Sequence, residues 1–136
     1  MFVAYNKVRM HDTDLAGILY FARLFRFAHD ALEDLLEAEG VTFKHMLRDN
    51  SFLFVIVHCE GNYYTSITAG EHLEVHLTIE KFGTTSFHAH YDIYRDSELV
   101  GSAKTVHVCI DTKTRQKMNI PDSVRQKFGK YLPSQA

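Results

Sequence analysis

Two carboxylates, Asp12 and Asp14, lie just before Gly17 and the apolar segment that follows it. An ionised carboxylate can attack an activated carbonyl carbon or take a proton from water. The apolar segment has a helical period, and the first turn of a helix offers unpaired N–H groups that stabilise negative charge. The spacing therefore predicts a carboxylate beside an anion-binding helix end, where chemistry could take place.

The same two residues also have a structural interpretation. An Asp before a helix accepts hydrogen bonds from the free N–H groups of the first turn and complements the helix dipole. From residue types alone this capping role is the favoured interpretation of Asp12 and Asp14, with Asp12 holding the loop in place.

A long helix is expected to position these groups. From Gly17 to about Glu39, polar side chains recur every three or four residues and mark one stripe of a helix. The other positions are almost all apolar, so we expect other structure to wrap around the helix rather than to lie along one side of it. Gly40 fits the left-handed residue that ends many helices.

Strands are expected after the helix, because the hydrophobic period changes from 3.6 to 2. Residues 72–80 and 87–94 alternate strictly between polar and apolar side chains, and Asp96-Ser97-Glu98 is typical of a hairpin turn. Further strands are expected at 4–9, 52–64 and 99–110, and a short helix at 121–131. The order predicts an α+β fold with one helix against one antiparallel sheet.

Composition limits the function further. The 136 residues, 46% of them hydrophobic, are enough for one domain over residues 1–136 with its own core. Fifteen basic residues against 17 acidic ones give no charge field for nucleic acid or an anionic membrane. No apolar run reaches the roughly 20 residues of a membrane span, and Cys59 and Cys109 match no redox or metal spacing. We expect a reduced, cytoplasmic setting and, because a single sheet leaves strand edges unpaired, a homo-oligomer.

Nine histidines raise the question of a metal site. His72 with His76, and His88 with His90, share a face of their strands. Alternate polar positions of strands hold histidine in any case, and no third ligand is identifiable from the sequence. We expect no metal.

The segment from Asp12 to Tyr20, with sequence DTDLAGILY, resembles the signature of the 4-hydroxybenzoyl-CoA thioesterase family, whose members have the hotdog fold. The resemblance covers nearly the whole chain, including the segments 70–75 and 105–110. It implies a hotdog domain that hydrolyses an acyl-CoA without a cofactor, in an assembly of hotdog dimers that reaches a tetramer.

The resemblance also implies roles for particular residues. The second acid of the signature, Asp14, is the catalytic carboxylate in that family, with Gly17 in the same turn. The backbone N–H of Phe21 polarises the thioester carbonyl. Asp14 acts either as a nucleophile or as a general base, and the sequence does not choose between them.

Other residues are candidates for binding the substrate. Lysine and arginine bind phosphates, and the candidates for the coenzyme A phosphates stand near strand ends. The substrate-binding candidates are Tyr20, His11, Thr65 and Ser66, and the coenzyme A candidates are Lys81, Lys104 and Arg115.

Residue types at a few positions indicate which subfamily the chain resembles. Bacterial thioesterases of the Tol-Pal system carry Tyr and His where this chain has Met10 and Phe21. Tyr20-Phe21, His29 and the strand from Thr105 look more like the 1,4-dihydroxy-2-naphthoyl-CoA thioesterases of phylloquinone and menaquinone synthesis. We therefore expect an aromatic acyl-CoA as substrate. The alternatives are a thioesterase for short aliphatic or other acyl groups, and a hotdog module that binds acyl-CoA without turnover.

Overall fold

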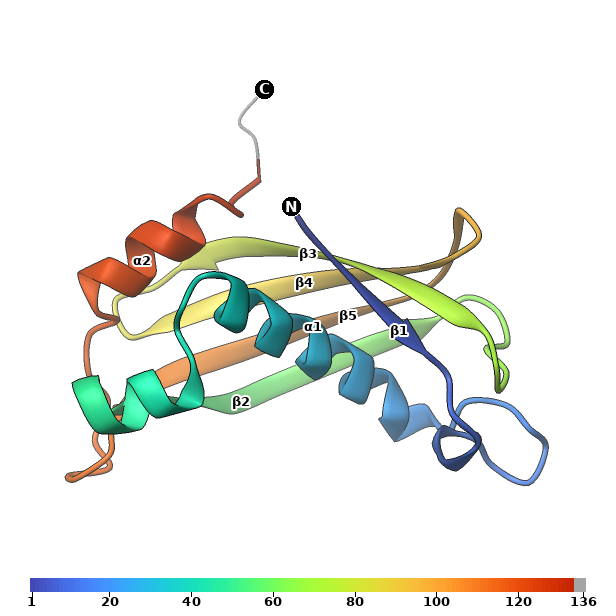
Figure 1. The fold of residues 1–136 in the computed structure, drawn as a ribbon, viewed down its shortest axis with the longest axis horizontal. Helices are drawn as coiled ribbons and strands as arrows, with labels where there is room; N and C mark the ends of the chain where they lie inside the picture. The colour runs from blue at the N-terminus through green and yellow to red at the C-terminus, as the bar shows by residue number, and fades with distance from the viewer. Residues whose placement is uncertain (134–136) are drawn as a thin grey trace.

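In the computed structural model, a long helix crosses one face of a five-stranded antiparallel sheet (Figure 1). Residues 1–133 are described, with the side chains of 49 and 50 excepted. The strand order is β1-β3-β4-β5-β2. The main elements are β1 (Phe2–Lys7), α1 (Leu24–Ala38), β2 (Phe52–Tyr63), β3 (His72–Phe82), β4 (Ser86–Arg95), β5 (Glu98–Asp111) and α2 (Asp122–Gly129). This arrangement confirms the α+β prediction of one main helix against one sheet.

The inner face of the sheet forms most of the core, as the alternating pattern predicts. Leu73, Val75, Leu77 and Ile79 of β3 are all buried, while the residues between them are partly exposed. Strand β4 repeats the pattern, and its turn to β5 places Asp96 and Ser97 at positive φ, as a tight hairpin requires. The strand predictions are therefore correct to within two residues at most ends.

The helix begins later than the sequence predicts. Residues 17–20 are not helical, Phe21–Arg23 form a single 3-10 turn, and α1 begins at Leu24. The helix ends at Ala38, and Gly40 takes the expected left-handed conformation with φ +74°. The sheet wraps around the apolar sides of α1, as predicted, and leaves His29, Glu33 and Glu37 of the polar stripe exposed.

Gly61 sets how closely the start of α1 approaches the sheet. A Cβ atom at this position of β2 would lie 2.8 Å from Leu24 Cδ2 and 3.3 Å from Phe25 Cζ. Contacts this short are repulsive, so a side chain here would push the helix start away. The missing side chain lets the first turn of α1 lie directly on β2 and β5, which fixes the end of the helix nearest to the two aspartates.

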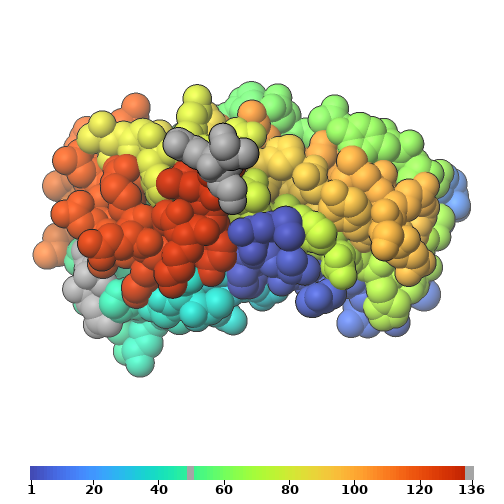
Figure 2. All heavy atoms as spheres, turned by 90° about the horizontal axis from the view of Figure 1, so that it is seen from above, coloured from blue at the N-terminus to red at the C-terminus, as the bar shows by residue number. Residues whose placement is uncertain are grey.

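The two edges of the sheet differ. The outer strand β1 is short, and the remainder of β3 is covered by the C-terminal segment, where Ile79 N–H donates to Tyr131 O at 2.9 Å. Figure 2 shows the C-terminal helix beside the N-terminal strand, and the rings of Phe2 and Tyr131 meet edge to face at 6.0 Å. The other outer strand, β2, has 12 residues with no strand beyond it among the described residues. No helix among the described residues is long and apolar enough to span a membrane.

Candidate active site

Residues 13–19, which we call the acid loop, form a tight hairpin rather than the first turns of the helix. Thr13 and Leu19 pair as an antiparallel bridge, and Asp14 N–H donates to Ile18 O at 2.9 Å. Gly17 N–H donates back to Asp14 O, and Gly17 has φ +75° with open space where a Cβ would be. Gly17 thus serves the backbone conformation of the loop, because few side-chain-bearing residues adopt this φ.

The carboxylate of Asp14 lies exposed at this loop. Its Oδ1 accepts the N–H of Ala16 at 2.8 Å and that of Ile18 at 3.4 Å, which fixes the side chain against its own loop. Its Oδ2 has no hydrogen-bond partner among the described residues. Asp14 therefore caps the loop and not the helix, and it leaves one oxygen free for chemistry.

Phe21 begins the 3-10 turn that leads into α1. Its N–H donates to no acceptor within the described chain, and its side chain is 64% exposed. Tyr20 N–H, one residue earlier, is tied to Asp12 O at 2.8 Å, which holds this turn beside the acid loop. The unpaired N–H at a helix start is the type of donor that stabilises a developing oxyanion.

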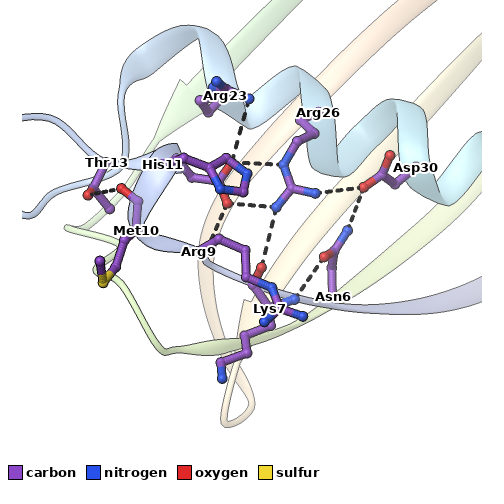
Figure 3. A network of polar contacts seen from close by, with 10 residues as sticks. Asn6, Lys7, Arg9, Met10, His11, Thr13, Arg23, Arg26 and Asp30 are labelled. Carbon is purple, nitrogen blue, oxygen red and sulfur yellow. Dashed lines mark hydrogen bonds and ion pairs between the residues drawn. The ribbon is translucent and has the colours of Figure 1, made fainter.

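Asp12, directly before the acid loop, binds Arg26 of α1, and Figure 3 shows Arg26 reaching on to Lys7 of β1 and to Asp30. Asp12 is fully buried and binds Arg26 through two hydrogen bonds, Nε to Oδ1 at 2.8 Å and Nη2 to Oδ2 at 2.6 Å. Arg26 also reaches Asp30 at 2.9 Å and Lys7 O at 3.3 Å. Burial alone would raise the pKa of Asp12, but the hydrogen bonds from Arg26 and from Arg9 N–H hold it below its usual value. Asp12 is thus a structural ion-pair partner.

A surface hollow of about 380 Å³ lies beside the acid loop. Ile18 and Phe21 line it together with Thr65 and Ser66. The structure therefore brings two of the predicted substrate-binding residues next to the predicted oxyanion donor. Tyr20 is exposed, with its ring 4.8 Å from that of Phe21.

His11 and the predicted coenzyme A residues do not join this hollow within one protomer. His11 is exposed, with Nε2 3.7 Å from Asp12 Oδ1. Lys104 pairs with Glu80 at 3.1 Å on the sheet face away from α1, and Lys81 is exposed at the end of β3. Arg115 lies in the turn after β5, at the end of the sheet opposite to the acid loop (Figure 1). Among residues 1–133 no three His, Cys, Asp or Glu side chains are arranged to hold a metal.

A second hollow, which we call the inner cavity, was not predicted from the sequence. It measures about 390 Å³ and lies between α1, the segment after it, and the start of β2. Its walls are mainly apolar, with Leu36, Phe43, Phe54 and Phe87 among them, and His107 at the sheet side. A volume of this size is in the range of small-molecule sites, which run from about 300 to 1,000 Å³.

His107 is a buried histidine that the sequence analysis did not select. It is 2% exposed, stacks on Phe87 with ring centroids 4.8 Å apart, and binds Thr105 Oγ1 through Nε2 at 2.8 Å. Thr105 in turn binds the buried hydroxyl of Tyr91 at 2.9 Å. Burial, with the nearby His29 as a smaller influence, lowers the pKa of His107 from 6.5 to about 4. The signal in the sequence was Thr105 and His107 at inward positions of an otherwise apolar strand.

The buried His107 predicts a pH dependence of stability. Between pH 6.5 and 4 the unfolded chain binds a proton at this residue that the folded chain does not bind. The free energy of unfolding therefore falls as the pH drops through this window, by about 3 kcal/mol in total. Urea titrations between pH 7 and 4 should show a shallower decline for His107→Phe than for the wild type. Parallel declines would contradict the neutral state of His107.

The sheet order, the single crossing helix and the acid loop at its start define the hotdog class of α+β folds. The chain belongs to the thioesterase-like superfamily, whose family model matches residues 8–128. It is 35% identical over 127 residues to a 1,4-dihydroxy-2-naphthoyl-CoA hydrolase of Nostoc punctiforme, covering 93% of this chain and 86% of that protein. A hydrolase of the same name from Rippkaea orientalis is 35% identical over 124 residues, with 89% and 90% covered.

A solved structure gives the same result. The crystal structure of a 1,4-dihydroxy-2-naphthoyl-CoA thioesterase from Synechocystis superposes with a TM-score of 0.87 at 28% identity, covering 94% of this chain and 95% of that one. The predicted hotdog fold is therefore confirmed.

Proposed function

We propose that this protein hydrolyses an aromatic acyl-CoA, with 1,4-dihydroxy-2-naphthoyl-CoA as its substrate. The observation that carries the proposal is the acid loop, where the free Oδ2 of Asp14 and the unpaired N–H of Phe21 are offered at one helix start. The names of the relatives supply the acyl group. Assignment to the 4-hydroxybenzoyl-CoA branch of the superfamily stays part of this proposal.

The two groups divide the chemistry between them. The Phe21 N–H donates to the thioester oxygen and stabilises the negative charge that develops there. Asp14 either attacks the thioester carbon, giving a mixed anhydride that water then cleaves, or takes a proton from the attacking water. On both routes one water is consumed, and the products are the free aromatic acid and the coenzyme A thiol.

The site is completed by a second copy of the chain. No strand of the described chain pairs with the outer edge of β2, and the middle of β2 carries exposed apolar side chains, Val57 being 58% exposed. Exposed strand edges of this length pair with another chain. If two copies of β2 pair antiparallel about a two-fold axis, the start of one strand lies beside the end of the other.

This pairing explains how the acid loop meets the inner cavity. Leu53 and Phe54 at the start of β2 line the inner cavity, whereas Tyr63 at its end lines the hollow beside the acid loop. Within one protomer these two regions lie at opposite ends of the strand. Pairing of β2 with β2 places the acid loop of one copy at the inner cavity of the other, which gives two shared active sites in a dimer.

The β2 edge provides a direct test of assembly. The wild type is expected to show at least twice the 15.7 kDa chain mass in light scattering at micromolar concentration. Val57→Lys places two like charges near the two-fold axis and should shift the protein toward the monomer, with activity lost in parallel. Tyr5→Lys, which adds the same charge at an exposed residue of the short β1 edge, should leave the mass unchanged. A monomeric wild type would contradict the shared site, and association of dimers into a tetramer remains a prediction.

Substrate choice is tested with a panel of acyl-CoAs. Values of kcat/KM should be highest for 1,4-dihydroxy-2-naphthoyl-CoA, lower for benzoyl-CoA and lowest for a short aliphatic acyl-CoA. A reversed order would favour the aliphatic alternative. Binding of acyl-CoA without release of thiol would instead favour a binding module.

A further inference from the structure

The inner cavity contains one polar group whose direction can be worked out from its partners. His107 Nε2 is bonded to Thr105 Oγ1, and Nδ1 has no partner among the described residues. No fully buried side-chain nitrogen or oxygen of the described chain lacks a hydrogen bond. The Nδ1 atom must therefore keep open surface, and the surface next to His107 is the inner cavity.

The hydrogen-bond chain behind His107 determines which ring nitrogen carries the proton. Tyr91 is fully buried, and among the described residues its hydroxyl bonds only to Thr105. Burial raises the pKa of this hydroxyl to about 12, so it remains protonated. A buried hydroxyl proton without an acceptor is costly, so Tyr91 donates to Thr105. Thr105 then donates its own proton to His107 Nε2, which must accept.

A neutral imidazole that accepts at Nε2 carries its proton on Nδ1. The hydrogen bonds from Tyr91 through Thr105 thus fix His107 as a hydrogen-bond donor toward the inner cavity. The cavity walls are mainly apolar and aromatic, although His29, Glu33 and Lys44 also line them, so the ligand that fits is a flat, mainly apolar group with one oxygen acceptor at His107.

We propose that His107 is a specificity-determining residue that donates a hydrogen bond from Nδ1 to a ring oxygen of an aromatic acyl group held in the inner cavity. The proposal rests on the proposed function, which it deepens by naming the group that selects hydroxylated aromatic rings. Tyr91 acts as a positioning residue, because it sets the direction of the hydrogen bonds through Thr105 to His107 without touching the ligand.

The kinetic test compares two substrates with the same carbon skeleton, 1,4-dihydroxy-2-naphthoyl-CoA and 2-naphthoyl-CoA, which lacks the ring oxygens. A site built to bond a substrate hydroxyl rejects the analogue without it. The ratio of kcat/KM between the two should fall by about tenfold or more in His107→Phe. His88→Phe makes the same change on the outer face of the sheet, at a position of β4 that points away from the core. This variant should keep the wild-type ratio. An unchanged ratio in His107→Phe would overturn the proposal.

A second measurement does not depend on turnover. In protein with 15N-labelled histidine, NMR should show His107 neutral with its proton on Nδ1, and free 1,4-dihydroxy-2-naphthoate should shift that nitrogen. Tyr91→Phe removes the phenol that sets the direction and should move the proton partly to Nε2. A proton on Nε2 in the wild type, or no shift with the naphthoate, would overturn the assignment. If the naphthoate shifts the His107 nitrogen but neither thioester is hydrolysed, the proposed function is contradicted, while the hydrogen bond from His107 Nδ1 is supported.

Discussion

Asp14→Asn is expected to lower kcat for the aromatic acyl-CoA by about a thousandfold, within the range for loss of a catalytic carboxylate. Asparagine keeps an oxygen that can accept the N–H groups of Ala16 and Ile18, so the acid loop should keep its conformation. It has no carboxylate oxygen to attack the thioester or to take a proton from water. KM should change little, since the loss falls on the chemical step. Steady-state release of free thiol measures both constants.

The matched control for this prediction is Asp34→Asn. Asp34 is an exposed acid on α1, outside the acid loop and outside the residues that line either hollow. Its replacement should leave kcat within twofold of the wild type. Equal rates for Asp14→Asn and the wild type would return Asp14 to the role of a loop cap.

Arg26→Met is expected to destabilise the fold by about 3–5 kcal/mol, a large part of the total for a domain of this size. Asp12 is fully buried, and the change removes both of its hydrogen bonds to the guanidinium. The same side chain pairs with Asp30 one turn further along α1 and reaches Lys7 O at the end of β1, so those contacts are lost as well. Chemical denaturation followed by circular dichroism measures the difference.

Arg23→Met makes the same substitution three residues earlier on the helix side of the network. Arg23 lies 3.8 Å from Asp12 and is partly exposed, so its loss should cost no more than about 1 kcal/mol. Similar values for the two variants would show that Asp12 does not depend on Arg26. The double variant Arg26→Met with Asp12→Asn should recover part of the lost stability, because no uncompensated charge remains buried.

The sheet was predictable because strict alternation leaves little choice of register. In β3 the apolar residues Leu73 to Ile79 are all buried, and a shift by one residue would have exposed every one of them. The start of the helix was not predictable in the same way. Ile18 to Phe21 continue the apolar pattern of α1, but Gly17 at positive φ and the pairing of Thr13 with Leu19 close a hairpin there instead.

The candidate site was only partly accessible from the sequence. Local spacing was enough to select Asp14 and Phe21, since both lie within one short segment. The inner cavity combines residues from α1, the following segment, β2, β4 and β5, and no local pattern relates His29 to His107. Lys81 and Arg115 were chosen from strand ends without knowledge of which end of the sheet holds the acid loop. Such placement depends on the strand order, which is a tertiary property.

The most direct test of the central claim follows free thiol and aromatic acid together after mixing the purified wild-type protein with 1,4-dihydroxy-2-naphthoyl-CoA. Hydrolysis at the acid loop predicts many turnovers per protomer, with one thiol and one 1,4-dihydroxy-2-naphthoate released for each thioester consumed. Release of no thiol from this substrate, by protein shown to be folded, would contradict the account.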